Sequence, residues 1–357
     1  MYRSSRRISG GGIVGKRNVK NQVDQALKKI YKIGESKKQL RDNHQETGIH
    51  STTQVKHAYS VSMQFVQWAK GQKGIKDIYR LKRAHYREYL THKANQGVSK
   101  GHLMNIETSL RLLSKGMNQF SKDQGFKERD WVPKQRLIHS SERSKGQDRS
   151  YTRDEVQKIR ENLPEGSQNA LDLQNAFGLR LREAANLKAA HIEEKHGKLY
   201  FVASEDRGSL NSAKGLTKAS KARETPCLSR YEGKVRSILA EKEQHQFLAP
   251  KYNTVKSAYN RAVEKAKVTN YTGSHGFRHS FARERLEASL KERGIYREGK
   301  DIINRMVENY DQGVRKDAGI PHSERKLYME VNQCVDIVHQ ELGHGKGRMD
   351  LVAIYMR

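Results

Sequence analysis

The sequence at residues 275–282 reads His275-Gly276-Phe277-Arg278-His279-Ser280-Phe281-Ala282. A helix over this stretch would place His275 and Arg278, three positions apart, on one face. The H-x-x-R pair alone is weak evidence, because about one such pair is expected by chance in a chain this rich in histidine and arginine. The surrounding run adds weight, and three other segments have to be considered with it.

The first of these segments places Arg180 just after a glycine in an apolar helix. A guanidinium there could offer paired N–H donors to a phosphate, although an arginine paired with Glu183 at i+3 is the ordinary alternative. A lone tyrosine near a terminus, such as Tyr355, is ordinarily a packing residue. The segments are Gly178-Leu179-Arg180…Glu183, Lys218-Ala219-Ser220-Lys221-Ala222-Arg223-Glu224-Thr225-Pro226 and Leu342-Gly343-His344…Tyr355.

Together the four segments resemble the tyrosine recombinase (phage integrase) family. Its catalytic domain carries a G-L-R-x-x-E box, a strand-borne K-x-x-K-x-R-x-x-P segment, an H-x-L-R-H-x-F-A box and an L-G-H…Y ending, and residues 151–357 contain all four in this order. The resemblance implies a mainly α fold, in which a helical N-terminal core-binding domain precedes a mostly helical catalytic domain with a small antiparallel sheet.

The resemblance also assigns roles. Tyr355 would attack the phosphorus and form a 3′-phosphotyrosine, with His275 as the plausible proton acceptor, and Lys218 would protonate the leaving 5′ oxygen. Spacing to Pro226 favours Lys218, with Lys214 and Lys221 as alternatives. The two arginines would stabilise the transition-state charge and the two histidines would add hydrogen bonds, whereas His279 and Glu183 would be structural. The expected catalytic set is Arg180, Lys218, His275, Arg278, His344 and Tyr355.

The chain departs from the family pattern between Arg278 and Tyr355. Tyr355 follows His344 by eleven positions where nine is usual, and His344 lies 66 positions after Arg278, more than in compact members. We expect an insertion of charged helix and loop near residues 290–332. Only Met356 and Arg357 follow Tyr355, so we expect this insertion, and not a tail beyond the nucleophile, to join protomers.

The composition indicates a polyanionic partner. The chain has 69 Lys and Arg against 40 Asp and Glu, a net charge of +29. Residues 1–150 contain 32 basic and 12 acidic residues, a net +20. Cys227 and Cys334 lie far apart without a nearby ligand set, so we expect no metal and no cofactor. Without a signal peptide or a long apolar stretch, we expect no membrane partner and a cytoplasmic, nucleoid-associated protein.

The pattern of apolar residues divides the chain. We expect a flexible basic arm at 1–15, a helical core DNA-binding domain at 16–132 with four or five helices, an exposed linker at 133–150 and the catalytic domain at 151–357. Thr152 and Glu155 form a capping-box pattern at the start of that domain. Residues 198–202 and 224–228 are the clearest strand candidates.

These features predict a site-specific DNA recombinase that cleaves and rejoins DNA without metal or ATP, in integrase- or excisionase-type strand exchange. Its partners would be double-stranded DNA with a specific recombination site and further copies of the chain, a dimer on one site and a tetramer in synapsis. The alternatives are relaxation of DNA in the manner of a type IB topoisomerase and a catalytically silent DNA-binding protein of the same fold.

Overall fold

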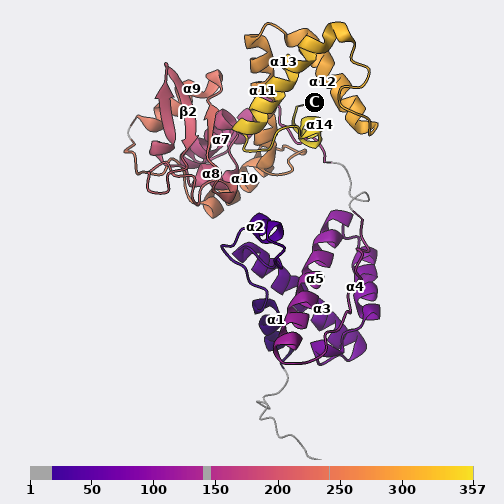
Figure 1. Cartoon of the computed structure of the whole chain (residues 1–357). Coiled ribbons are helices and arrows are strands. Elements are labelled where there is room, and N and C mark those ends of the chain that lie inside the picture. The colour runs from indigo at the N-terminus through magenta and orange to yellow at the C-terminus, as the bar shows by residue number, and fades with distance from the viewer. Residues whose placement is uncertain (1–17, 140–145, 241, 357) are drawn as a thin grey trace, which may run out of the picture. The chain divides into compact units, whose positions relative to one another are not determined.

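The computed structural model describes residues 18–139, 146–240 and 242–356. The arm expected at residues 1–15 lies outside the described residues. The chain divides into two compact units, Met1–Lys145 and Gly146–Arg357, which are described here separately (Figure 1). Within the described residues, no helix is both long and apolar enough to cross a lipid bilayer.

The first unit consists of helices around one apolar core. Ser51 caps the helix Thr52–Lys73, and its hydroxyl accepts a hydrogen bond from the Gln54 backbone N–H. Phe65, Tyr89 and Trp131 form aromatic contacts within the core. The helices are α1 (Val19–Lys28), α2 (Lys37–Asp42), α3 (Thr52–Lys73), α4 (Arg83–Asn95) and α5 (Lys100–Asp123).

Residues 133–138, expected to be exposed linker, are bound to α5. The Arg111 guanidinium donates to the carbonyls of residues 133–135. The buried Glu107 carboxylate accepts from the backbone N–H groups of Leu137 and Ile138 and from the Tyr86 hydroxyl. The segment supplies hydrogen-bond donors that the buried Glu107 carboxylate needs. Residues 133–138 are therefore part of the first unit.

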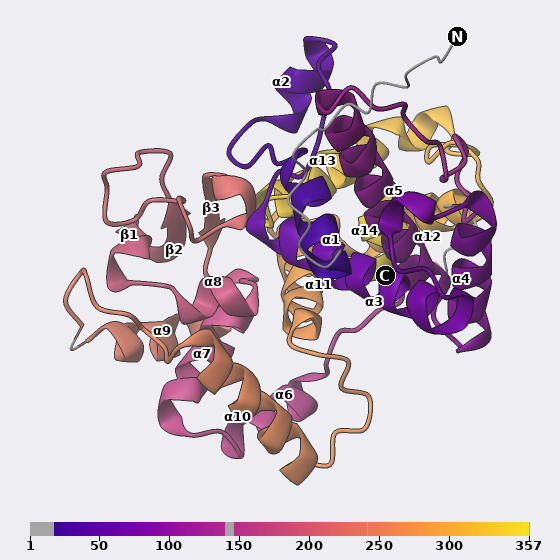
Figure 2. The same cartoon turned by 90° about the horizontal axis from the view of Figure 1, so that it is seen from below.

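The second unit is also mostly helical. The predicted capping box is present, since Thr152 and Glu155 bond reciprocally to each other's backbone N–H groups. Helix α10 lies against both α6 and α7 (Figure 2). The helices are α6 (Arg153–Glu161), α7 (Glu165–Phe177), α8 (Leu181–Ala185), α9 (Glu232–Leu239), α10 (Tyr252–Lys265), α11 (His275–Glu292), α12 (Tyr296–Asp311), α13 (Arg325–Glu341) and α14 (Met349–Tyr355).

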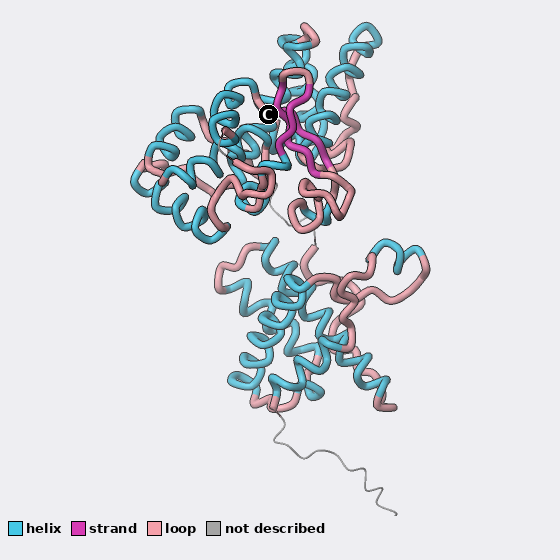
Figure 3. Tube along the Cα trace, turned by 90° about the vertical axis from the view of Figure 1, so that its left-hand side faces the viewer, coloured by secondary structure: helices cyan, strands magenta, loops and turns pink. Residues whose placement is uncertain are grey.

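A small antiparallel sheet, magenta in Figure 3, completes this unit. Its strand order is β1-β2-β3, with β1 at Ile192–Lys195, β2 at Lys198–Ala203 and β3 at Arg223–Pro226. Phe201 pairs with Ile192 on one side and with Thr225 on the other. The sequence indicated β2 and β3, but β1 is short and its Glu-Glu-Lys run concealed it. Lys218 lies in the β2–β3 connection and not on a strand.

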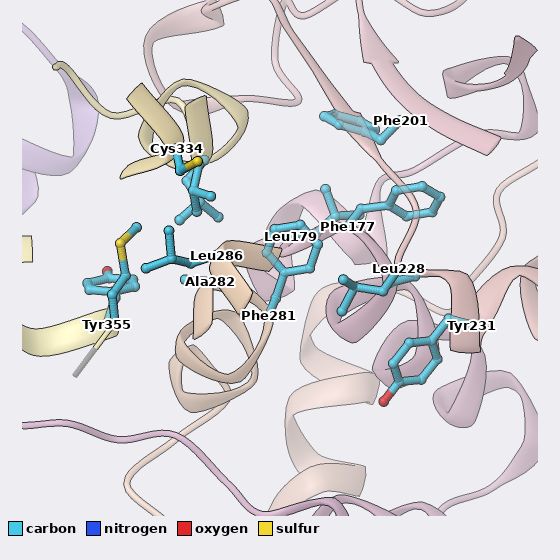
Figure 4. Close-up of a cluster of buried hydrophobic side chains, with 14 of the residues drawn as sticks. Phe177, Leu179, Phe201, Leu228, Tyr231, Phe281, Ala282, Leu286, Cys334 and Tyr355 are labelled. Atoms are coloured by element: carbon cyan, nitrogen blue, oxygen red, sulfur yellow. The ribbon is translucent and has the colours of Figure 1, made fainter. Parts of the chain in front are cut away.

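The stretch at residues 290–332 is part of the core of the second unit. Helix α12 buries Ile302, Ile303, Met306 and Val307 against α11, α13 and α14. Figure 4 shows Tyr355 at one end of the same apolar cluster. Removing residues 290–332 would therefore unfold the surroundings of Tyr355. The stretch expected as an insertion of charged helix and loop thus contains a core helix, α12, and the connection between α12 and α13.

Candidate active site

The corner between α7 and α8 positions Arg180. Gly178 ends α7 with φ +60, and a Cβ there would lie 2.4 Å from the Phe281 ring, so only glycine fits. The Arg180 guanidinium donates to Glu183 at 2.7 Å, and the same carboxylate accepts from the Arg180 backbone N–H. The ion pair that was the ordinary alternative for Arg180 is thus present.

Helix α11 begins at His275 and carries Arg278 one turn later. Arg278 is fully buried and donates to the backbone carbonyls of Gly178 and Leu342. Burial and the charges of Arg223 and Arg180 lower the pKa of Arg278, but a guanidinium remains protonated in proteins. Arg278 therefore brings positive charge to the place where α7, α11 and the end of α13 meet.

Glu183 links three arginines from distant parts of the chain. Its carboxylate lies 2.7 Å from Arg180, 2.8 Å from Arg223 and 4.0 Å from Arg278. Burial opposes its ionisation, but the charges of Arg223, Arg278 and Arg180 outweigh burial and hold its pKa below the usual value. One buried anion thus reduces the mutual repulsion of three cations.

Tyr355 contacts the histidines His275, His279 and His344. Its hydroxyl lies 2.6 Å from Nε2 of His275, its ring stacks on His279 at 4.0 Å between centroids, and its side chain is only 6% exposed. Burial, with the charges of Arg278 and His279, lowers the pKa of His275 to about 4, so this ring is neutral and can accept the hydroxyl proton. Burial raises the pKa of Tyr355 despite the opposing charges of Arg278 and Arg180, so the tyrosine is protonated.

His344 lies between Arg278 and Tyr355. Arg278 lies 3.4 Å from Nε2 of His344, and since arginine can only donate, this nitrogen accepts. The other nitrogen, Nδ1, then carries the proton and finds no partner among the described residues. Burial, with the charge of Arg278, lowers the pKa of His344 to about 2. His344 is thus a neutral ring with one free N–H donor.

Lys218 lines a pocket of about 240 Å³ together with Arg180 and His344. It belongs to a tight turn in which Ala219 and Ser220 both have positive φ. Of the two alternative lysines, Lys221 lines the same pocket, whereas Lys214 lines another one. The pocket accordingly favours Lys218 or Lys221 as the lysine of this site.

The structure thus brings the six expected residues into one region through two sets of contacts. Hydrogen bonds and ring contacts join His275, Tyr355, His344 and Arg278, while the pocket joins His344 to Arg180 and Lys218. Sequence reasoning assigned no role to Arg223, which donates to Glu183 and to the Leu342 carbonyl. Arg223 could have been found from the sequence, because it is the arginine of the K-x-x-K-x-R-x-x-P segment.

Among the described residues, no group of three His, Cys, Asp or Glu side chains is arranged to hold a metal ion. The positive charge of the site comes from arginine and lysine side chains. Such a pocket suits an anion with several oxygen acceptors, because guanidinium groups can donate two parallel hydrogen bonds.

Comparison with known proteins gives the same fold. The XerH site-specific recombinase bound to difH substrate is 13% identical over 96% of this chain and 94% of its own, with a TM-score of 0.52. A lambda integrase tetramer bound to a Holliday junction is 15% identical over 94% and 76%, with a TM-score of 0.51. The Tn1549 transposon integrase in complex with transposon right end DNA is 14% identical over 94% and 95%, with a TM-score of 0.51.

The fold is therefore that of the tyrosine recombinases. Residues 149–297 match the model of the phage integrase family, so the chain carries a phage integrase domain. No curated protein matches the chain in sequence.

Proposed function

We propose that this chain is a site-specific DNA recombinase in which Tyr355 cleaves and rejoins DNA. The observation that carries the proposal is the 2.6 Å contact between the Tyr355 hydroxyl and His275, within a group of side chains that includes Arg278 and His344. A packing tyrosine needs neither a neutral histidine at its hydroxyl nor buried cations beside it.

In the proposed reaction, the Tyr355 oxygen attacks the phosphorus and the hydroxyl proton passes to Nε2 of His275. A 3′-phosphotyrosine bond forms as the bond to the 5′ oxygen breaks, and Lys218 gives that oxygen its proton. Rejoining reverses these steps. It consumes no ATP, because the energy of the broken phosphodiester bond is kept in the phosphotyrosine bond. The near-complete burial of Tyr355 requires DNA binding to expose the hydroxyl before attack.

The cationic groups would stabilise the extra negative charge of the transition state. Arg180 and Arg278 can each offer two N–H donors to non-bridging oxygens, and Nδ1 of His344 offers a further one. This charge stabilisation replaces what a metal ion supplies in other phosphoryl-transfer sites. We therefore expect cleavage to proceed in EDTA.

The proposed partners are duplex DNA with a specific recombination site and other copies of the chain, two on one site and four in synapsis. The basic surface supports DNA as the partner, because the net charge is +29. The assembly is supported by analogy with the lambda integrase tetramer on a Holliday junction.

A covalent selection tests this proposal. The chain is incubated in EDTA with nicked duplexes of randomised sequence, and DNA attached to protein is recovered under denaturing conditions. A recombinase gives adducts at a defined sequence, a silent DNA-binding protein gives none, and a type IB topoisomerase also relaxes plasmid that lacks the recovered sequence. Magnesium-dependent cleavage without adducts would contradict the tyrosine mechanism.

A further inference from the structure

Arg348 lines the same pocket as Arg180, Lys218 and His344, although no catalytic role of the family falls on its position. It lies in the segment Gly345-Lys346-Gly347-Arg348, which follows His344 and accompanies the eleven-residue spacing to Tyr355. A longer connection at this point changes which side chains reach the pocket. Arg348 is the arginine that this longer connection adds to the lining of the pocket.

The backbone around Arg348 is held in place. The His344 N–H donates to the His339 carbonyl at 2.7 Å, and the Gly347 N–H donates to Asp336 Oδ1 at 3.0 Å. Gly347 has φ +69, a conformation that glycine adopts without strain. The loop is thus bonded at both ends to α13, which fixes the point from which the Arg348 side chain extends.

The pocket is lined by cations without a carboxylate among its lining residues. Arg223 and Arg180 both donate to Glu183, so the cations of the pocket that do not bind this carboxylate are Lys218, Lys221 and Arg348. The charge of Arg348 also contributes to the lowered pKa of His344, which places it within electrostatic range of the site. An anion in this pocket would be attracted by Arg348.

Arg348 is held by an exchangeable partner. Its guanidinium donates to both Asp350 oxygens, at 2.8 and 2.6 Å, and the two side chains are 51% and 40% exposed. An exposed ion pair is weak, because water and salt screen it. A phosphate presents the same two-oxygen edge as a carboxylate and can take its place.

We propose that Arg348 is a further phosphate-binding residue of this pocket, held by Asp350 in the DNA-free chain and transferred to the scissile phosphate when DNA binds. The proposal rests on the function proposed above. Arg348 then shares with Arg180 and Arg278 the charge that develops on the non-bridging oxygens, and the longer loop after His344 serves to deliver it. Asp350 keeps the arginine oriented until the phosphate arrives.

The test compares two forms of the nicked duplex recovered by the covalent selection. One has a natural phosphate at the cleaved position and the other a methylphosphonate, in which a methyl group replaces one charged oxygen. We expect Arg348→Gln to slow adduct formation on the phosphate on the order of 10²-fold, as removal of one donor to a developing oxyanion does. On the methylphosphonate, the variant should react nearly as fast as the unmodified chain, because the charge that Arg348 stabilises is absent.

Arg315→Gln is the matched control, because Arg315 forms the same two-residue bidentate pair, with Asp317, outside this pocket. It should react as the unmodified chain does on both substrates. Asp350→Asn should strengthen DNA binding without slowing cleavage, since it releases Arg348. This variant tests the proposal even if Arg348→Gln folds poorly.

The outcomes separate the two proposals. If the unmodified chain forms no adduct, the proposed function is wrong and this inference fails with it. If the unmodified chain reacts but Arg348→Gln is as fast on the phosphate, or is slowed equally on both substrates, Arg348 does not bind the reacting phosphate. Slower cleavage by Asp350→Asn would likewise contradict the proposed transfer of Arg348 from Asp350 to the scissile phosphate.

Discussion

Tyr355 can lose its hydroxyl with little change in packing, because the ring rests on His279 and within the apolar end of the core. We expect Tyr355→Phe to abolish covalent attachment to DNA and to leave DNA binding nearly intact, since it removes the attacking oxygen and no cation. Loss of the buried hydrogen bond to His275 should cost about 1–3 kcal/mol of the free energy of unfolding. Gel mobility of denatured protein–DNA complexes measures attachment. Adducts from the variant would assign the nucleophile to another tyrosine, such as Tyr328 or Tyr310.

The protonation of His275 sets a pH limit on cleavage. Its pKa is about 4 in the DNA-free chain, and the pKa of Tyr355 is raised. The acceptor is therefore neutral above about pH 5 and becomes protonated as the pH falls through 4. We expect kcat/KM for adduct formation, which reports the free enzyme, to be flat from about pH 6 to 8 and to fall only under acid conditions. A fall centred near pH 6.5, the ordinary histidine value, would show that burial does not lower the pKa of the acceptor.

The sequence predicted the side chains of the site better than their connections. Arg180, His275, Arg278, His344 and Tyr355 were found because they stand in ordered boxes, and the structure brings them together. Of the links through Glu183, only the i+3 pair with Arg180 could be anticipated, because Arg223 and Arg278 lie 40 and 95 positions after Glu183 in sequence. Nor could the choice between Lys218 and Lys221, which both line the pocket.

At the level of elements, the stretch expected as an insertion of charged helix and loop contains α12, which lies in the core of the second unit. Its apolar residues recur at helical spacing and face the neighbouring helices. We expect Met306→Ala to lower the free energy of unfolding by about 2–5 kcal/mol, as for other buried side chains of this size. Met329→Ala, at an exposed position of α13, should change it by less than about 0.5 kcal/mol. Urea denaturation measures both, and equal values would place α12 outside the core.

The connection between α12 and α13 remains the candidate for contacts between protomers. Val314, in this connection, is 49% exposed, and Met329, near the start of α13, is 57% exposed, although both are apolar. Exposed apolar side chains are found at protein interfaces. We expect Val314→Glu with Met329→Glu to preserve cleavage at a single site and to prevent a four-protomer DNA complex, as measured by light scattering. Phe247→Glu, at another exposed apolar position, is the control, and a double variant that still forms the complex would refute the contact.

The charge of the whole molecule should govern its grip on DNA of arbitrary sequence. The chain has a net charge of +29, and each contact between a basic side chain and a DNA phosphate releases counterions from the DNA. The affinity for DNA should therefore fall about 10³-fold or more between about 50 and 200 mM salt. Lys56→Gln and Lys70→Gln, at exposed positions of the first unit, should each reduce the salt slope by about 1 if they contact phosphates. Lys326→Gln, on α13, is the control. Fluorescence anisotropy measures the slope, and an affinity independent of salt would exclude phosphate contacts as its source.

The three-way ion network at Glu183 also bears on safety in the cell. An enzyme that breaks chromosomes is hazardous if fragments of it, or partly melted copies, can still cut. In the proposed reaction the guanidinium groups of Arg180 and Arg278 stabilise the phosphate, and both share the Glu183 carboxylate with Arg223. A chain that is still emerging from the ribosome, or has been clipped by a protease between these positions, has the reactive residues without their arrangement. Damage to the protein therefore abolishes the proposed DNA cleavage and does not produce unintended DNA breaks.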